Sequence, residues 1–171
     1  MTDLRTYIRD VPDFPKPGIV FKDITPLLRA PEAFMETMSA LAEPYRGEGI
    51  TAVAGIESRG FIFGACVASL LGAGFIPIRK PGKLPWTKRS HEYALEYGTD
   101  TLEIHDDAAT AADRVLIIDD VLATGGTAAA AASLVRGLDA TLVGIATVIE
   151  LAFLEGRRKI AGVPFHSLIV Y

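Results

Sequence analysis

Val115-Leu-Ile-Ile-Asp-Asp-Val-Leu-Ala-Thr-Gly-Gly-Thr127 is the stretch that decides the fold of this chain. Its first four residues are apolar and β-favouring, which predicts a strand buried on both faces. An alanine-rich run follows, and we expect a helix over residues 126–138 that is capped by Thr127. A strand, a polar loop and a helix in this order indicate an open α/β sheet, where ligands bind at the carboxyl ends of strands.

The loop between this strand and helix has the composition of a phosphate site. The free N–H groups of a helix start and of residues 124–127 favour a phosphate dianion. Asp119 and Asp120 would repel that phosphate unless they face ligand hydroxyls or a metal ion. A phosphorylated ribose satisfies both conditions, whereas an ordinary strand–turn–helix connection is the alternative. A Walker A site is disfavoured because Thr127 and Ala128 replace its Lys and Ser or Thr, and the GxGxxG spacing is absent.

The rest of the chain continues the alternation. The chain is expected to begin with a short N-terminal helix and a proline-rich hook at residues 11–18. Strands are expected at residues 52–56, 75–79, 115–119, 141–149 and 165–170. Helices are expected at residues 31–45, 60–71, 126–138 and 152–160. This predicts a mostly parallel sheet with helices on both faces, in a single domain over residues 1–171. Residues 1–30 form a small hood in this scheme. Regular periodicity fails between Lys80 and Gly98, so we expect a lid loop over residues 80–98.

Composition limits the function. The chain has 171 residues, 50% of them hydrophobic, which suits one compact domain. A net charge of −4 argues against a nucleic-acid partner. Residues 79–89 nevertheless contain Arg79, Lys80, Lys83, Lys88 and Arg89 without any acid, which indicates a small polyanionic ligand.

The cellular location of the protein is predicted from three features of the sequence. A single cysteine, Cys66, cannot form an internal disulfide and suits the reducing cytoplasm. The N-terminus lacks the hydrophobic core of a signal peptide, so export is not expected. Residues 61–78 are apolar, but glycines and Pro77 divide them into a helix, a turn and a strand, so no membrane span is expected.

Cations are expected at two further strand ends. Residues 54–61 repeat the order of strand, polar loop and helix start, and Arg59 there could bind a second phosphate group bidentately. The alternative is a surface ion pair between Arg59 and Glu57. Arg79 ends the next strand and is followed by Lys80 and Lys83, a set that would stabilise a leaving polyphosphate unless it is only a solvated face.

Residues 119–127 resemble the phosphoribosyl pyrophosphate (PRPP) motif of the type I phosphoribosyltransferases. Three further segments resemble one family among them, the adenine phosphoribosyltransferases. These are PDFPKPGIVFKDITP at residues 12–26, AGIESRGF at residues 54–61, and a lid pattern of RKPGKLP at residues 79–85 followed by EYALEYG at residues 92–98. The resemblance is continuous from about residue 11 to residue 138. It implies the type I phosphoribosyltransferase fold.

The resemblance also implies roles for single residues. Asp119 and Asp120 would hold the ribose hydroxyls, and the 5-phosphate would lie on Ala123, Thr124, Gly125, Gly126 and Thr127. Pyrophosphate would face Arg59, Arg79, Lys80 and Lys83, with Mg²⁺ held mainly by PRPP and no direct protein ligand assigned. Adenine would lie between Phe21 and Val121, where the family more often has Leu, with its edge read by backbone groups of Val20 and Lys22. Glu96 in the lid, together with Arg59, would be catalytic.

The implied activity is transfer of the 5-phosphoribosyl group from PRPP to adenine, giving AMP and pyrophosphate in purine salvage. The displacement would pass through an oxocarbenium-like transition state, and a closing lid would exclude water. The implied partners are adenine, PRPP and a second copy of the chain, with residues 59–71 near the dimer interface. A phosphoribosyltransferase for another base and a non-catalytic PRPP-sensing regulator are the alternatives. His91, His105 and His166 are expected to be structural, because they lack metal spacing or a nucleophile partner.

Overall fold

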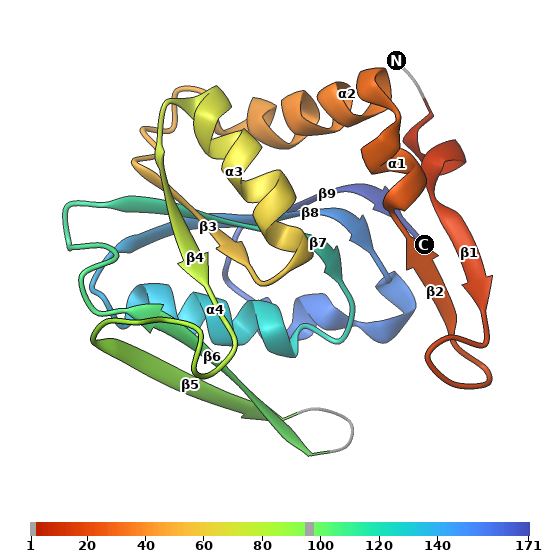
Figure 1. Cartoon of the computed structure of the whole chain (residues 1–171). Coiled ribbons are helices and arrows are strands. Elements are labelled where there is room, and N and C mark those ends of the chain that lie inside the picture. The colour runs from red at the N-terminus through yellow and green to blue at the C-terminus, as the bar shows by residue number, and fades with distance from the viewer. Residues whose placement is uncertain (1–2, 95–97) are drawn as a thin grey trace.

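The computed structural model describes residues 3–94 and 98–171. Its centre is a five-stranded sheet with the order β4-β3-β7-β8-β9, in which every neighbouring pair is parallel (Figure 1). The strands are β3 (Ala52–Ile56), β4 (Gly74–Ile78), β7 (Arg114–Leu122), β8 (Thr141–Glu150) and β9 (Phe165–Val170). The predicted parallel sheet is therefore confirmed, and each predicted strand has its counterpart within a few residues.

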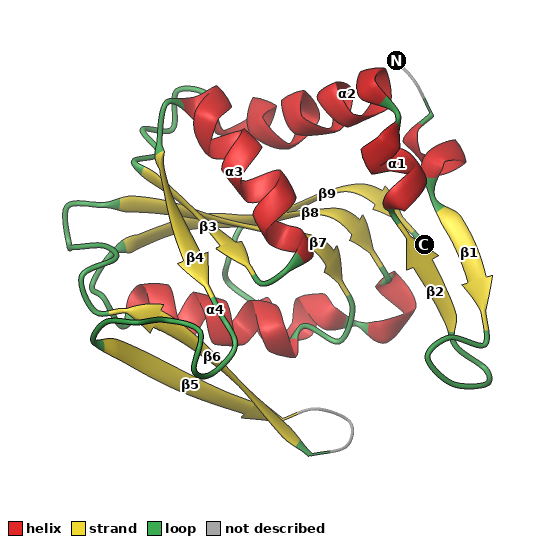
Figure 2. Ribbon diagram, in the orientation of Figure 1, coloured by secondary structure: helices red, strands yellow, loops and turns green. Residues whose placement is uncertain are grey.

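Helices cover both faces of this sheet, as Figure 2 shows. On one face lie α2 (Pro31–Ala42) and α3 (Arg59–Leu71), with α1 (Thr25–Arg29) beside them. The other face carries α4 (Gly126–Arg136). The central strands are buried on both sides because their apolar side chains feed two separate cores: Leu116 and Ile118 pack with α2 and α3, whereas Val115 and Ile117 pack with α4.

Two boundaries around the phosphate loop differ from the sequence prediction. We define the phosphate loop as residues 123–127. Strand β7 does not end at Asp119 but continues to Leu122, so both acids belong to the strand. The prediction that Thr127 caps the helix is wrong: α4 begins at Gly126, and the capping position is Gly125, which has a left-handed backbone with φ of 80°. Thr127 thus lies in the first helical turn.

The lid loop is the main correction to the predicted fold. Residues 80–98 are not irregular throughout, because β5 (Lys88–Ala94) pairs antiparallel with β6 (Thr99–His105), a strand that the sequence analysis did not predict. This β5–β6 hairpin packs against α4. The hook at residues 11–18 connects two further strands, because β1 (Arg9–Pro12) pairs antiparallel with β2 (Val20–Asp23).

The remaining short elements are 3₁₀ helices. These are η1 (Leu4–Tyr7), η2 (Glu43–Tyr45), η3 (Ala152–Leu154) and η4 (Gly156–Ile160). The helix predicted for residues 152–160 is therefore two 3₁₀ segments, and the predicted helix over residues 31–45 is α2 followed by η2. Among the described residues, none of the helices has the length and hydropathy needed to cross a bilayer.

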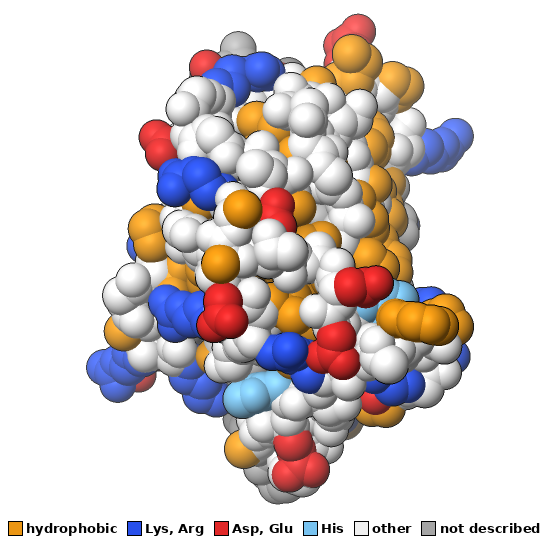
Figure 3. Space-filling model, turned by 90° about the vertical axis from the view of Figure 1, so that its left-hand side faces the viewer, with side chains coloured by type: hydrophobic (Ala, Val, Ile, Leu, Met, Phe, Trp, Pro, Cys, Tyr) orange, Lys and Arg blue, Asp and Glu red, His pale blue; other side chains and the backbone are white. Residues whose placement is uncertain are grey.

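Exposed hydrophobic side chains gather along one edge of the face in Figure 3. On α3 and the edge strand β4, Ile62, Leu70 and Phe75 are each more than one-third exposed. Phe75 also packs edge-to-face on Phe61, with ring centroids 5.7 Å apart. We name the exposed set Ile62, Leu70 and Phe75 the α3–β4 patch.

Candidate functional site

A cleft of about 490 Å³ opens at the carboxyl ends of β3 and β7. These two strands are neighbours, but the chain leaves β3 toward β4 and leaves β7 toward β8, on opposite sides. Such a reversal of strand order leaves a crevice where ligands of α/β proteins bind. The cleft is lined by Ile56, Glu57, Ser58, Arg59, Lys80, Asp119, Asp120, Val121, Leu122, Ala123, Thr124, Gly125, Thr127 and Ala128.

Two adjacent carboxylates line this cleft. Asp119 Oδ1 accepts the backbone N–H of Asp120 at 2.9 Å, and Asp120 is only 4% exposed. The start of α3 lies directly beside them, because a Cβ on Gly60 would come within 2.8 Å of Asp119 Oδ1. Glycine at this position therefore lets the helix approach the acid.

The electrostatics of the pair favour a partner that carries hydrogen-bond donors or positive charge. Burial and then the charge of Asp120 raise the pKa of Asp119 well above its usual range. Burial also raises the pKa of Asp120, although Arg59 opposes this through an ion pair of 2.7 Å between its Nε and Asp120 Oδ2. Sugar hydroxyls or a divalent cation would relieve the remaining cost of the buried charges.

The phosphate loop is held by close backbone packing. Gly125 has φ of 80°, and a Cβ there would lie 2.9 Å from the carbonyl carbon of Gly156 and closer still to its oxygen. A Cβ on Gly156 would in turn meet the backbone of Ala123. The first helical bond runs from Ala129 N–H to Gly125 O, so the N–H groups of the preceding turn face outward as donors. The arrangement is suited to an anion.

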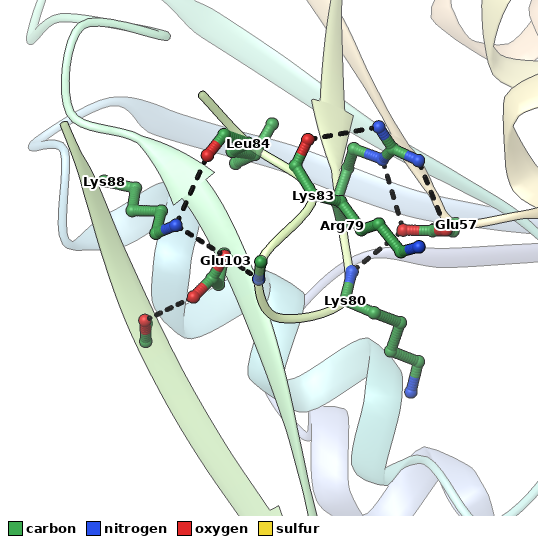
Figure 4. A network of polar contacts seen from close by, with 9 residues as sticks. Glu57, Arg79, Lys80, Lys83, Leu84, Lys88 and Glu103 are labelled. Carbon is green, nitrogen blue, oxygen red and sulfur yellow. Dashed lines mark hydrogen bonds and ion pairs between the residues drawn. The ribbon is translucent and has the colours of Figure 1, made fainter. Parts of the chain in front are cut away.

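Basic side chains approach the cleft from the segment after β4, where Glu57 organises them (Figure 4). Its carboxylate accepts Arg79 Nε at 3.2 Å and Arg79 Nη2 at 3.3 Å, and it also accepts the backbone N–H of Lys80 at 2.9 Å. The Lys80 backbone bond, followed by Arg79 and the charge of Lys83, holds the pKa of Glu57 below its usual range despite some desolvation. Lys80 itself extends away from Glu57, as Figure 4 shows, and lines the cleft.

Further along, Glu103 fixes the irregular segment between β4 and β5. Its carboxylate accepts Gly82 N–H at 3.1 Å and Ser90 Oγ at 3.3 Å, and Lys88 Nζ lies 3.4 Å away (Figure 4). Glu103 is 6% exposed, so these partners satisfy a buried charge. The backbone of the cationic segment is thereby tied to β6.

The hood reaches the same cleft through Arg59. The Arg59 guanidinium carbon lies 5.1 Å from the centre of the Phe21 ring, and Phe14 packs edge-to-face on that ring at 5.3 Å. Lys22 is turned away, with Nζ bound to Asp10 at 2.7 Å. Val20 is about half exposed. Val121 lines the cleft, whereas Val20, Phe21 and Lys22 of the hood are not among its lining residues.

Comparison with known proteins agrees with this geometry. A phosphoribosyl transferase domain model matches residues 23–163. An adenine phosphoribosyltransferase from Acaryochloris marina is 56% identical over 169 residues, covering 99% of both chains. The chain belongs to the adenine phosphoribosyltransferase family.

Solved structures of family members superpose over nearly the whole chain. The enzyme from Thermoanaerobacter pseudethanolicus has a TM-score of 0.96 at 50% identity, with 99% of this chain and 98% of that chain covered. The enzyme from Saccharomyces cerevisiae has a TM-score of 0.92 at 42% identity and 97% and 96% coverage. That structure contains adenine and an imino-altritol bisphosphate. The predicted type I phosphoribosyltransferase fold is therefore confirmed.

The structure brings most of the predicted site residues to one cleft. The cleft is lined by both acids, by Arg59, Lys80 and Val121, and by four of the five phosphate-loop residues. The fifth, Gly126, starts the adjoining helix. Arg79 and Lys83 are not among the lining residues: Arg79 is held by Glu57, and its Nη1 donates to the Lys83 carbonyl at 3.3 Å. Glu96 lies outside the described residues.

Several contacts of this site were not predicted from the sequence. Arg59 pairs with Asp120 and not with Glu57, which instead binds Arg79. Gly156 supports the phosphate loop although it lies 31 residues after Gly125 in the chain, and Tyr93 packs on Gly126. The glycine at 156 was a possible signal, but nothing local in the sequence links it to residue 125.

Proposed function

We propose that this protein transfers the 5-phosphoribosyl group of PRPP to adenine and releases AMP and pyrophosphate, as in purine salvage. The observation that carries the proposal is the union of a buried acid pair and a glycine-rich helix start at the carboxyl end of β7, in a chain of this family. An acid pair suits the hydroxyls of a ribose, and a helix start suits its phosphate.

PRPP would bind with its phosphoribosyl part along the end of β7. Asp119 and Asp120 would accept hydrogen bonds from the 2′ and 3′ hydroxyls, which donate to carboxylates whose burial leaves them short of donors. The 5-phosphate would accept from backbone N–H groups of the phosphate loop. Gly125 supports this role, because its left-handed backbone turns the chain from the strand into the helix.

The pyrophosphate group would lie between Arg59 and Lys80, which face the cleft from two different strand ends. Arg79 and Lys83 would add positive potential from behind, since Glu57 holds Arg79 in place. Negative charge grows on the leaving group in the transition state, so fixed cations lower the barrier. Arg59 would then have to exchange its bond to Asp120 for one to the substrate.

Mg²⁺ is proposed as the cofactor, held mainly by PRPP. The described residues contain no group of three or more potential metal-ligating side chains, so the protein would contribute little beyond the acid pair. A divalent cation fits there, because two adjacent buried carboxylates are costly when both are charged. When bound, the cation would neutralise charge on the phosphate oxygens.

Adenine would bind between Phe21 of the hood and Val121 of the cleft wall, with backbone groups of Val20 and Lys22 reading its edge. An aromatic face and an apolar face suit a flat purine. The Phe21 ring is now in contact with Arg59. Release of Arg59 toward pyrophosphate would free this ring for the base, so binding of the two substrates would be coupled.

The reaction would break the bond from the anomeric carbon to pyrophosphate and form a bond to an adenine nitrogen. Glu96 would manage the proton of the base, and residues 80–98 would exclude water from the oxocarbenium-like transition state. Glu96→Gln is expected to lower kcat far more than it changes PRPP affinity. Unchanged turnover in this variant would make Glu96 a bystander.

A homodimer is proposed through the α3–β4 patch. Strand β4 is an edge of the central sheet, and Ile62, Leu70 and Phe75 place apolar area next to it. Exposed edges and apolar patches of this kind mark association surfaces. We also propose a cytoplasmic location, in keeping with the free thiol of Cys66. Sedimentation at micromolar protein concentration would test the dimer.

The activity is tested with purified protein, PRPP and Mg²⁺, and a panel of adenine, hypoxanthine, guanine and orotate. The expected result is AMP from adenine with an equal amount of pyrophosphate, and little turnover of the other bases. Activity on hypoxanthine or guanine without activity on adenine would refute the base assignment. PRPP binding without turnover of any base would favour a regulator.

A further inference from the structure

The β5–β6 hairpin carries a chain of hydrogen bonds that ends on both anion-binding parts of the cleft. Tyr93 on β5 and Asp100 on β6 face each other in the strand register. The Tyr93 hydroxyl lies 3.1 Å from Asp100 Oδ2 and 3.2 Å from Thr127 Oγ1. Asp100 Oδ2 also accepts Lys80 Nζ. Four side chains thus connect the phosphate loop to the lysine in the opposite wall.

The direction of these bonds is set by donor and acceptor chemistry. Asp100 is an acceptor only, so both Lys80 and Tyr93 donate to it. The single phenolic hydrogen of Tyr93 is then used, and the hydroxyl of Thr127 must donate to the Tyr93 oxygen. Asp100 is therefore the acceptor on which the whole chain depends.

Packing supports the same arrangement. Tyr93 is 9% exposed, and a Cβ on Gly126 would lie 3.2 Å from its Cδ2, so the ring rests on the first turn of α4. Burial lowers the pKa of Lys80, but the hydrogen bond that Lys80 donates to Asp100 and the neighbouring charges outweigh this effect, and the net pKa lies above the usual value. The ammonium group therefore stays charged, and only one of its N–H donors is needed for Asp100.

We infer that Tyr93 and Asp100 are positioning residues for PRPP, which hold Lys80 and Thr127 at the spacing of its pyrophosphate and 5-phosphate. This inference rests on the proposed function. PRPP carries its two anionic groups at opposite ends of one ribose, so both ends bind well only when their sites are set at a fixed separation. The hairpin would supply that separation through Tyr93 and Asp100, neither of which is among the residues that line the cleft.

The charge of Asp100 makes the inference testable, because a positioning role and a bystander role predict opposite changes in PRPP affinity when this charge is removed. A carboxylate close to a polyanion site repels the ligand, so neutralising a bystander acid would strengthen PRPP binding. Neutralising a positioning acid would weaken it, because Lys80 and Tyr93 would lose the acceptor that orients them. Asp100→Asn therefore gives opposite results under the two accounts.

The experiment measures KM for PRPP, KM for adenine and kcat in wild type, Tyr93→Phe, Asp100→Asn and the double variant. Each single substitution is expected to raise KM for PRPP about tenfold, as for loss of one hydrogen bond to a charged group. KM for adenine and kcat should change less than about threefold. The double variant should fall short of the product of the single effects, because the residues belong to one chain of bonds.

Asp106→Asn is the matched control, because it removes the 2.9 Å pair between Asp106 and Arg89 in the same region without touching the cleft. It should leave KM for PRPP unchanged. Calorimetric titration with PRPP and Mg²⁺ repeats the comparison without turnover. The two proposals can therefore fail separately: the positioning role of Tyr93 and Asp100 can be refuted while the protein still forms AMP, and it can be supported even if the protein uses no base. An unchanged or lower KM and Kd for PRPP in Tyr93→Phe and Asp100→Asn would overturn it. If Asp100→Asn does not fold, Tyr93→Phe decides alone.

Discussion

Gly125→Ala isolates the backbone packing that shapes the phosphate loop. Alanine would have to adopt φ of 80°, which costs about 1–2 kcal/mol for a residue with a Cβ. Its Cβ would also lie 2.9 Å from the Gly156 carbonyl carbon and closer to the oxygen, well inside the contact distance of about 3.5–4.0 Å. Because the obstacle is backbone, the loop or η4 must move by roughly 1 Å. A misplacement of that size costs about 10²-fold in activity.

Gly162→Ala is the matched control for this substitution. Gly162 has φ of 83°, but a Cβ there meets nothing within 4 Å, so only the conformational cost applies. This control should lower Tm by roughly 2–8 °C, as expected for about 1–2 kcal/mol in a domain of this size. Its kinetic constants should stay at wild-type values.

The assay pairs thermal unfolding with calorimetric titration of PRPP and Mg²⁺. Gly125→Ala should lose clearly more stability than Gly162→Ala and bind PRPP more weakly, and its kcat/KM for PRPP should fall about 10²-fold. Wild-type PRPP affinity in Gly125→Ala would refute the assigned role of the loop. Equal losses of Tm in the two variants would refute the packing argument.

Two further predictions concern buried carboxylates. Asp119→Asn should raise Tm by roughly 2–4 °C at pH 8 while it abolishes tight PRPP binding. Burial and the charge of Asp120 raise the pKa of Asp119, so the wild type loses stability as pH rises through that pKa. The gain in Tm from Asp119→Asn should therefore shrink toward pH 5 in parallel Tm scans. A lower Tm for the variant than for the wild type at pH 8 would contradict this prediction. Glu150→Gln should reduce stability by about 1–2 kcal/mol at pH 7, since Arg157 binds both carboxylate oxygens at 2.6 Å but is itself half exposed. The Arg157 bonds lower the pKa of Glu150, so the stability lost in Glu150→Gln should fade below about pH 4 in urea unfolding. A loss of stability that is independent of pH would exclude the charge of Glu150 as its cause.

The middle of the central sheet was predictable because β3 and the first part of β7 are buried on both faces. Residues 115–118 are continuously apolar and fully buried, and β3 and β9 have the predicted bounds. The acid pair and the phosphate loop follow from the same segment. Local sequence was sufficient where the chemistry and the strand belong to one continuous stretch.

The β5–β6 hairpin was missed for a physical reason. Strand β5 is exposed at most positions, and only Tyr93 in it is buried, so it has no alternation of period two. The signal lies in β6, where Leu102 and Ile104 are buried after the turn at Gly98. Their spacing of two, behind a turn glycine, was the available indication of a hairpin.

Partners of the charged residues were also beyond local sequence. Glu57 and Arg59 are two residues apart, yet each pairs with a different strand end. Arg59 reaches Asp120 on β7 and the Phe21 ring of the hood, whereas Glu57 reaches Arg79 after β4. Such pairings depend on strand order, which a single sequence does not specify.

A crystal structure with AMP bound would test the account most directly. We predict its phosphate on the backbone N–H groups of the phosphate loop, its ribose hydroxyls on Asp119 and Asp120, and its base between Phe21 and Val121, with Arg59 moved away from the Phe21 ring. AMP bound with its phosphate at Arg59 and Lys80, and its base against α4, would contradict the account.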